Sequence, residues 1–218
     1  MSGPGNPGLA AELLRHGAAT LGETGGLVTH PRIKAAWPGA AVAGPAYTVK
    51  LGEGDNLAIH VACAEAPAGS VLVVDATNPP DFGYWGEVLT TQAVARGIAG
   101  LVIDGGCRDV AALQARGFPV FSALVTLRGA AKEHGGSVGD IVVVGGTPVR
   151  PGDWVVGDAD GVTVVPGAHV DGIAELARTR TDREQELFAA LGAGATTIEQ
   201  LGLDPSAVRR GDGTEVAR

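Results

Sequence analysis

The sequence has 218 residues, enough for one domain with a sizeable hydrophobic core. Its formal net charge of −8, with no basic cluster, argues against a nucleic-acid or membrane-surface partner. The apolar runs are only strand-length, the N-terminus has no apolar signal core, and two cysteines form no disulfide framework, so we expect a cytoplasmic protein.

The first half of the chain alternates helix and strand patterns. In order, we expect a short helix over 9–16, a strand over 42–49, a helix from Asp55 or Asn56 to Glu65, and a strand over 71–75. Pro45 lacks an N–H group, which suggests that its strand is an edge strand or that Pro45 lies near its start.

The prediction centres on residues 86–109, which read GEVLTTQAVARGIAGLVIDGGCRD. Apolar residues at helical spacing predict a helix from Glu87 that ends at Arg96-Gly97. The apolar run 101–103 predicts a buried strand, followed by a short glycine loop that ends in Arg108-Asp109. With the strand over 71–75, this helix and strand form a parallel crossover unit.

The crossover predicts a site at one edge of the sheet. Glu87 and Arg108-Asp109 are separated by twenty residues, yet both follow the carboxyl ends of parallel strands, where open α/β sheets bind ligands. Two carboxylates suit a hard divalent cation. The guanidinium and the free amides at the start of the helix suit a substrate carboxylate.

Other candidate residues receive structural interpretations. Asp75 follows a strand, but no G-x-G-x-x-G precedes it, so a dinucleotide site is excluded. His60 lies between apolar neighbours in a helix pattern and is interpreted as a structural histidine. Cys63 and Cys107 are expected to be buried. None of the three lysines lies in a clearly apolar setting, which argues against Schiff-base chemistry.

The second half of the chain has a different pattern. Short strands are expected over 141–144, 154–156 and 162–165, and glycine-rich turns between them predict antiparallel or mixed pairing. A long helix follows over 169–191, and a short one over 197–203. The charged run 183–186 by itself reads as a solvated helix face.

Residues 86–109 resemble the core of the 4-hydroxy-4-methyl-2-oxoglutarate aldolase family, which also contains the regulator of ribonuclease activity A. Residues 38–50, 54–76 and 149–166 share the resemblance. It implies a single α/β domain of the three-layer β/β/α swivelling type over 20–191. A segment with a short helix (1–19) and a short helix with a polar tail (192–218) would flank this domain. It also implies homotrimers or hexamers with active sites between subunits.

The resemblance further implies a class II aldolase. Members cleave 4-hydroxy-4-methyl-2-oxoglutarate or 4-carboxy-4-hydroxy-2-oxoadipate to pyruvate and a second oxo acid, and such a site could also decarboxylate oxaloacetate. Asp109 would be the direct ligand of Mg²⁺ or Mn²⁺, Glu87 would hold metal-bound water, and Glu184 would reach the site from the adjacent subunit. The substrate carboxylate would be bound by Arg108 and by the helix start at Gly86, Glu87, Val88 and Leu89.

Two alternatives stay open. The ribonuclease-regulating branch has the same fold but lacks the Asp of the Arg-Asp pair, so Asp109 favours the enzyme over a protein-binding regulator. A second alternative is an enzyme of this fold that acts on another 2-oxo acid. Residues 78–84 and 124–136 differ from typical members, and this leaves the identity of the substrate open.

Overall fold

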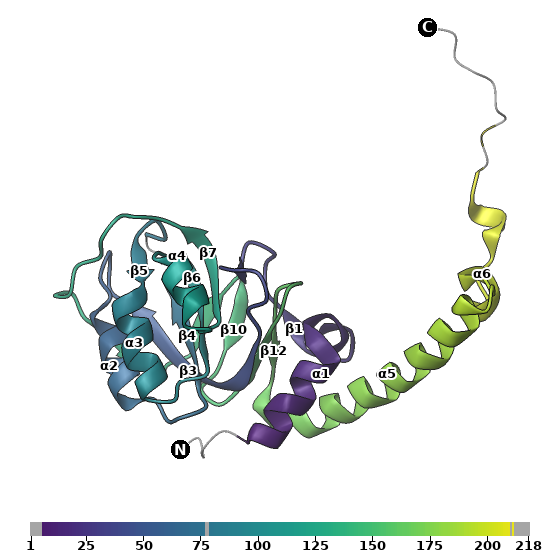
Figure 1. Cartoon of the computed structure of the whole chain (residues 1–218), viewed down its shortest axis with the longest axis horizontal. Coiled ribbons are helices and arrows are strands. Elements are labelled where there is room, and N and C mark those ends of the chain that lie inside the picture. Colours follow the sequence, from purple (N-terminus) through teal and green to yellow (C-terminus); the bar gives the residue numbers. More distant parts are fainter. Residues whose placement is uncertain (1–5, 77–78, 210, 212–218) are drawn as a thin grey trace, which may run out of the picture. The chain divides into compact units, whose positions relative to one another are not determined.

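The computed structural model describes residues 6–76, 79–209 and 211 (Figure 1). The chain divides into two compact units, Met1–Arg178 and Thr179–Arg218. The first unit contains the strands and most of the helices. The second contains the end of α5 (Val170–Gly192), followed by α6 (Thr197–Leu201) and the 3₁₀ turn η2 (Pro205–Ala207).

Ten strands form one sheet in the first unit, and a two-stranded hairpin accompanies it. The strands of the sheet are β1 (Leu27–Val28), β2 (Lys34–Ala35), β3 (Val42–Leu51), β4 (Val71–Asp75), β5 (Gly83–Trp85), β6 (Gly100–Cys107), β7 (Val120–Val125), β8 (Gly136–Val138), β11 (Trp154–Gly157) and β12 (Val162–Val165). The hairpin consists of β9 (Val142–Val144) and β10 (Thr147–Val149). The remaining helical elements are α1 (Pro7–Glu23), α2 (Leu57–Glu65), α3 (Glu87–Ala95), α4 (Val110–Ala115) and the 3₁₀ turn η1 (Gly167–His169).

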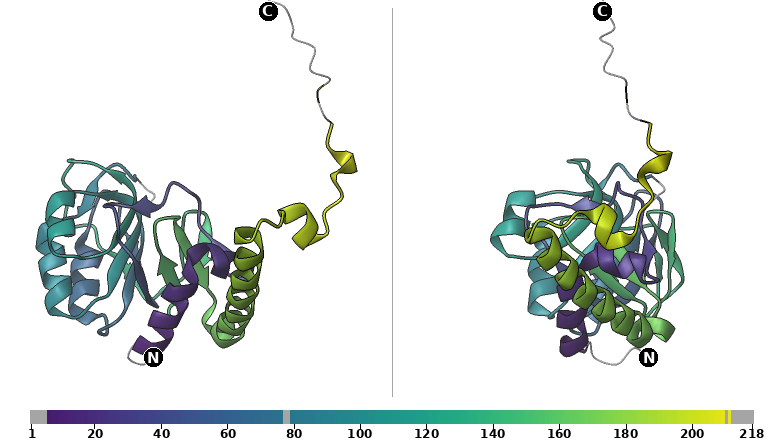
Figure 2. Two further views of the ribbon diagram at one scale, coloured as in Figure 1. Left: turned by 45° about the vertical axis from the view of Figure 1, so that its right-hand side comes forward. Right: turned by 90° about the vertical axis from the view of Figure 1, so that its right-hand side faces the viewer.

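The parallel half of the sheet consists of β3, β4, β6 and β7. The helices α2, α3 and α4 cover its outer face (Figure 2). The core between the helices and the sheet contains Trp85, Leu101 and Leu113, all fully buried. The predicted crossover of β4, α3 and β6 is confirmed. The predicted glycine loop is wrong, because β6 continues through Gly106 to Cys107 with a register shift against β7.

Strand β3 connects the two halves of the sheet. The prediction that Pro45 marks an edge or a strand start is wrong, because β3 lies between β11 and β4. Residues 42–45 pair with β11 and residues 46–50 pair with β4, so Pro45 stands where β3 changes partner. Pro45 lies opposite Trp154 at the end of the β11 ladder, where Ala46 donates the next bond, to the carbonyl oxygen of Asp153, and the β4 ladder begins only at Ala46. A residue without an N–H group is tolerated at that point because no ladder bond needs its donor.

The antiparallel half consists of β3, β11, β12 and β1, so the pairing predicted for the second half of the chain is confirmed. A second core joins the two halves and contains Val73, Phe121, Val155 and Val164. Residues from α1 and from the start of α5 form a third core with β11 and β12. The α/β class is therefore confirmed, and α1 and α5 add a helical cover that the β/β/α expectation did not include.

Two helices differ from their predicted bounds. Helix α1 runs from Pro7 to Glu23, and Gly17, predicted to end it, instead forms a kink with φ of 79°. Helix α5 matches its prediction to within one residue at each end. The predicted domain boundaries at 19/20 and 191/192 stay predictions. In the described part of the chain, no helix combines the length and apolar character needed to cross a membrane.

Candidate functional site

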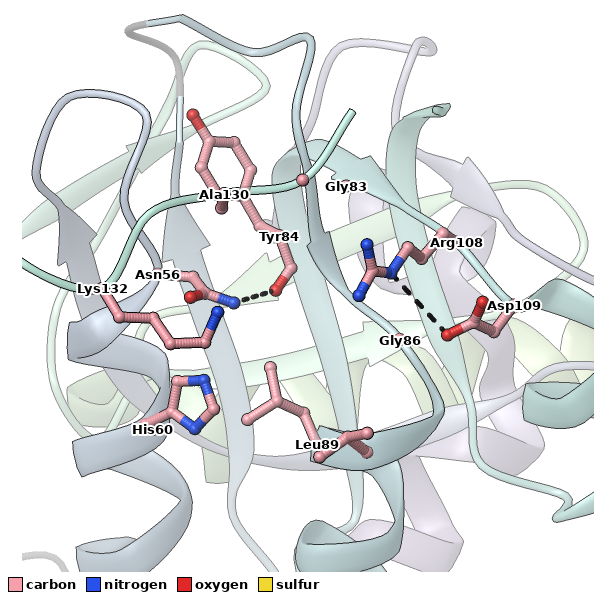
Figure 3. Close-up of a pocket in the computed structure, with 12 residues that line it drawn as sticks. Asn56, His60, Gly83, Tyr84, Gly86, Leu89, Arg108, Asp109, Ala130 and Lys132 are labelled. Carbon is pink, nitrogen blue, oxygen red and sulfur yellow. Dashed lines mark hydrogen bonds and ion pairs between the residues drawn. The ribbon is translucent and has the colours of Figure 1, made fainter. Parts of the chain in front are cut away.

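A cavity of about 330 Å³ lies at the predicted edge of the sheet, beyond the end of β6 (Figure 3). Its walls come from the start of α2, from β5 and the start of α3, from the end of β6, and from residues 126–134. We call residues 126–134, which lead from β7 towards β8, the strap. The lining residues are Asn56, His60, Gly83, Tyr84, Gly86, Val88, Leu89, Arg108, Asp109, Gly129, Ala130 and Lys132.

Asp109 has an unusual backbone conformation. Its φ is 58°, the only positive φ of a non-glycine residue in the described ranges. Its Oδ2 accepts the backbone N–H of Glu87 at 3.0 Å and lies 3.8 Å from Nε of Arg108. The side chain is 43% exposed, so its carboxylate is accessible to a cation. Left-handed residues of this kind cluster at functional sites because the surrounding structure must offset their strain.

Two glycines make room for Arg108 and Asp109. A Cβ on Gly86 would lie 2.4 Å from Asp109 Oδ2 and 3.1 Å from Arg108 Cγ. A Cβ on Gly83 would lie 3.2 Å from Arg108 Cδ and 2.7 Å from the carbonyl oxygen of Thr126. A side chain at position 83 would therefore clash with the main chain, and one at position 86 would displace the Asp109 carboxylate.

The backbone N–H of Glu87 bonds to Asp109, but the side chain of Glu87 pairs with Arg116. Glu87 Oε1 accepts bonds from Nε and NH2 of Arg116, at 3.2 and 2.7 Å. Glu87 is not among the residues that line the cavity. The predicted pairing of two carboxylates around one cation is therefore not formed in this conformation. Arg116 directly follows α4.

The start of α3 supplies the predicted amides. Val88 and Leu89 line the cavity, and Leu89 is buried. As second and third residues of the helix, their N–H groups have no intrahelical acceptor. Such groups together with the helix dipole favour an anion. Arg108 and the start of α3, which the sequence predicts to bind a carboxylate, therefore line one cavity.

His60 lines the cavity, which makes its interpretation as a satisfied structural histidine wrong. Its Nε2 is buried and has no hydrogen-bond partner among the described residues. Burial lowers the pKa of His60, the positive charge of Lys132 lowers it further, and Asp55 opposes them in part. The imidazole is therefore neutral at neutral pH.

Asn56 and Lys132 are further lining residues that the sequence analysis missed. Asn56 Nδ2 donates to the carbonyl oxygen of Tyr84 at 2.8 Å, which fixes the orientation of the amide. Asn56 Oδ1 is buried without a described partner. Figure 3 shows Asn56, His60 and Lys132 on one side of the cavity, opposite Arg108 and Asp109. His60 lies in α2, four residues after Asn56, which directly precedes that helix, and this spacing was a usable signal.

The remaining predicted residues lie elsewhere. Cys63 and Cys107 are fully buried, as predicted, and burial raises the pKa of Cys63 to about 12. Glu184 belongs to the second unit and pairs with Arg180 of the same helix at 2.9 Å. No group of three or more His, Cys, Asp or Glu side chains in the described residues is placed to hold a metal ion. An ion at Asp109 would thus have few direct protein ligands.

Comparisons with known proteins agree with this architecture. A family model described as RraA-like (Aldolase/RraA) matches residues 17–164. A protein from Halalkalibacterium halodurans, named as a candidate 4-hydroxy-4-methyl-2-oxoglutarate aldolase, is 40% identical over 157 residues, which are 72% of this chain and 75% of the relative.

Two solved structures are also similar. Streptomyces coelicolor RraAS2, described as an unusual member of the RNase ES inhibitor RraA family, matches with a TM-score of 0.71 and 30% identity over 87% of this chain and 99% of that chain. The RNA-processing inhibitor RraA from Thermus thermophilis matches with a TM-score of 0.63 and 28% identity over 68% of this chain and 92% of that chain.

The matched residues include the parallel half of the sheet, the strap and the segment that carries Arg108 and Asp109. The relatives carry two kinds of name, one for an aldolase and one for an inhibitor of RNA processing. Membership therefore establishes the fold, whereas the activity depends on the site. The resemblance predicted from the sequence is confirmed, and this chain belongs to the RraA-like family.

Proposed function

We propose that the chain is a divalent-metal-dependent carbon–carbon lyase. Its substrates are 4-hydroxy-4-methyl-2-oxoglutarate and 4-carboxy-4-hydroxy-2-oxoadipate, which it cleaves to pyruvate and a second oxo acid. The supporting observation is one cavity with two chemically different ends. A guanidinium and a carboxylate lie at one end, and an amide oxygen, an imidazole and an ammonium at the other. The names of the relatives support the reaction class.

The end at Arg108 binds the 2-oxo acid. The guanidinium is planar and can bind a carboxylate through two N–H groups. The N–H groups of Val88 and Leu89 bind the same carboxylate from the helix start. The backbone N–H of Arg108 donates to the carbonyl oxygen of Trp85 at 2.8 Å, which fixes the main chain from which the side chain extends. The 2-oxo group is thereby oriented beside Asp109.

Asp109 would hold the metal ion. One accessible carboxylate with few other protein ligands suits Mg²⁺ or Mn²⁺, which keep several waters, better than Zn²⁺. When bound, the ion would supply positive charge beside the 2-oxo oxygen, where negative charge develops during cleavage. The bond from the N–H of Glu87 keeps the carboxylate at the cavity wall.

The opposite end acts on the part of the substrate that leaves. The 4-hydroxyl gives up its proton and becomes the new carbonyl, the C3–C4 bond breaks, and its electron pair passes to C3 and the 2-oxo group. C3 then takes a proton from solvent, which completes pyruvate. His60 Nε2 accepts the hydroxyl proton because it is neutral and unpartnered. Asn56 Oδ1 orients the hydroxyl, and Lys132 binds the remote carboxylate.

The same end at Arg108 would support decarboxylation of oxaloacetate. That reaction also leaves pyruvate enolate, so it needs the same charge stabilisation at the 2-oxo oxygen. Oxaloacetate loses carbon dioxide in place of a carbonyl product, so no base is needed to remove a proton from a 4-hydroxyl. Substitution of His60 should therefore slow aldol cleavage much more than decarboxylation.

The proposed assembly is a homotrimer or hexamer with sites between subunits. Glu184 of an adjacent subunit would then complete the site as a catalytic residue. Glu184 pairs with Arg180 of the same helix and belongs to the second compact unit, where another subunit could receive it.

A protein-binding regulator of ribonuclease activity is the second candidate, and it is favoured by the name of the Thermus relative. Asp109 argues for the enzyme.

Release of pyruvate from several 4-hydroxy-2-oxo acids and from oxaloacetate, with Mg²⁺ and with EDTA, tests the proposal. We expect Mg²⁺-dependent release from the two 4-hydroxy diacids. Absence of release with every substrate and metal would overturn it. Ribonuclease inhibition by a protein that releases no pyruvate would support the second candidate.

A further inference from the structure

The strap is attached to the rest of the first unit at both ends. Near its start, Arg128 Nη1 pairs with Asp81 Oδ2 at 2.9 Å, and its guanidinium lies 3.8 Å above the ring of Phe82. The N–H of Gly83 donates to the carbonyl oxygen of Arg128 at 2.7 Å. These contacts hold the strap beside β5. Arg128 and Asp81 are both more than half exposed, so this attachment lies at the surface.

The other end of the strap is held by a buried carboxylate. Asp55 is 0% exposed, and its Oδ2 accepts the backbone N–H groups of Glu133, in a short bond, and His134, at 2.9 Å. Its Oδ1 accepts the N–H of Leu57 at 2.7 Å, at the start of α2. Nδ1 of His134 lies 3.5 Å from Oδ2. One side chain thus connects the strap to the start of α2, where Asn56 precedes the helix and His60 lies within it.

Backbone bonds reinforce this connection. The N–H of Ala131 donates to the carbonyl oxygen of Gly54 at 2.9 Å. The N–H of Asn56 donates to the carbonyl oxygen of Ala131 at 3.0 Å. Between the two attachments lie Gly129, Ala130 and Lys132, the strap residues that line the cavity. The strap therefore runs along the cavity from Gly83, beside Arg108, to Lys132 at the opposite end, and Asp55 holds its far end at the start of α2.

We propose that Asp55 is a positioning residue for substrate specificity: through the strap it places Lys132 against the remote carboxylate of the substrate. This inference rests on the proposed function. A carboxylate fully removed from water is costly unless its oxygens are hydrogen-bonded, and here both are. An amide at this position has only one acceptor oxygen, so it would leave an N–H group of the strap or of Leu57 opposed by another donor.

Two reactions distinguish the roles of the two ends of the cavity. Cleavage of a 4-hydroxy-2-oxo diacid uses both ends, whereas exchange of the C3 protons of pyruvate with deuterium in the presence of Mg²⁺ uses only the end at Arg108. We expect Asp55→Asn to raise KM for the diacid about tenfold, as for loss of a charge-assisted hydrogen bond, and to leave the exchange rate within about twofold. Glu133→Gln, which removes one charge from the strap while keeping its backbone bonds, is the matched control and should change neither.

Arg128→Ala tests the same idea at the exposed attachment, where misfolding is not a concern, and should raise KM for the diacid about threefold without affecting exchange. Equal loss of both reactions in these variants, or no change in either, would overturn the positioning role. Wild-type protein that neither exchanges nor cleaves would overturn both this inference and the proposed function. If the wild-type protein both exchanges the protons of pyruvate and cleaves the diacid, but the variants lose the two activities equally, only the inference is overturned.

Discussion

The Asp109 carboxylate and the backbone N–H of Glu87 are joined by a 3.0 Å hydrogen bond. This bond connects the second residue after β6 with the first residue of α3, across 21 intervening residues. It depends on the left-handed backbone of Asp109, which turns the side chain back towards α3. The one side chain proposed to hold a metal ion thus also fixes the helix start that binds the substrate carboxylate.

Asp109→Gly and Asp109→Ala should both reduce Mg²⁺-dependent turnover about a hundredfold or more, because either change removes the metal ligand. Their stabilities should differ. Glycine adopts φ of 58° without strain, whereas alanine is strained there by about 1 kcal/mol. Pyruvate release and thermal unfolding of the two variants measure these effects. Near-normal activity of either variant with Mg²⁺ would contradict the assignment of Asp109.

Gly86→Ala should disable the site by steric displacement. Its φ of −164° is accessible to alanine, so the effect comes only from the new Cβ, which would lie 2.4 Å from Asp109 Oδ2. We expect about a tenfold or larger loss of kcat/KM, since small displacements of catalytic groups are costly. Gly172→Ala, in α5 with no neighbouring heavy atom within 4 Å, is the control and should retain full activity. Equal activity of both variants would show that Arg108 and Asp109 need no such space.

Arg108→Lys should keep the charge but lose two-point binding of a carboxylate. The expected loss in binding is about 1–3 kcal/mol. Inhibition by oxalate, which resembles the 2-oxo acid end of the substrate, measures it directly. The circular dichroism spectrum should not change, because the side chain is 43% exposed. An unchanged inhibition constant for oxalate would remove Arg108 from the substrate site.

The pH dependence of cleavage should report His60. Burial, and then the charge of Lys132, lower its pKa below the ordinary value of 6.5. The neutral, proton-accepting form therefore persists at neutral pH and is lost only as pH falls through that lowered pKa. We expect an acidic limb of kcat below pH 6.5 that is missing in His60→Gln, whose residual kcat should be about a hundredfold lower. An identical acidic limb in His60→Gln would assign it to another group.

The sequence predicted the crossover well because its signals are local. Apolar runs of strand length and one run at helical spacing sufficed to place β4, α3 and β6, and hence Arg108 and Asp109 at one sheet edge. The direction of the Glu87 side chain was not predictable in this way. It depends on Arg116, which reaches Glu87 only after α4 packs beside α3.

The opposite end of the cavity was missed for a related reason. His60 in a helix of apolar neighbours looks structural until the strap places Lys132 beside it. The strap itself has no regular pattern, and its position depends on Asp55, almost eighty residues earlier in the chain. Pairings over such separations leave little trace in any short window of sequence.

Glu184 provides the last test, of a site shared between subunits. Glu184→Ala should slow cleavage with little change in stability, because its partly exposed ion pair with Arg180 of the same helix contributes little to the fold. Inactive Asp109→Ala and Glu184→Ala chains, unfolded and reassembled together, should regain part of the activity, since some interfaces then pair an intact Asp109 with an intact Glu184. Full activity of Glu184→Ala alone, or no recovery in mixed oligomers, would contradict a shared site.

The change of partner at Pro45 has a consequence for biosynthesis. Residues 46–50 of β3 can pair with β4 soon after residue 75 leaves the ribosome, whereas residues 42–45 must wait for β11 at 154–157. During that interval one flank of β3 is an unpaired edge, which is prone to pairing with other chains. Proline is one of the residues that discourage pairing at strand edges, and Pro45 lies at the end of this flank. We expect Pro45 to limit pairing with other chains until the antiparallel half has been synthesised.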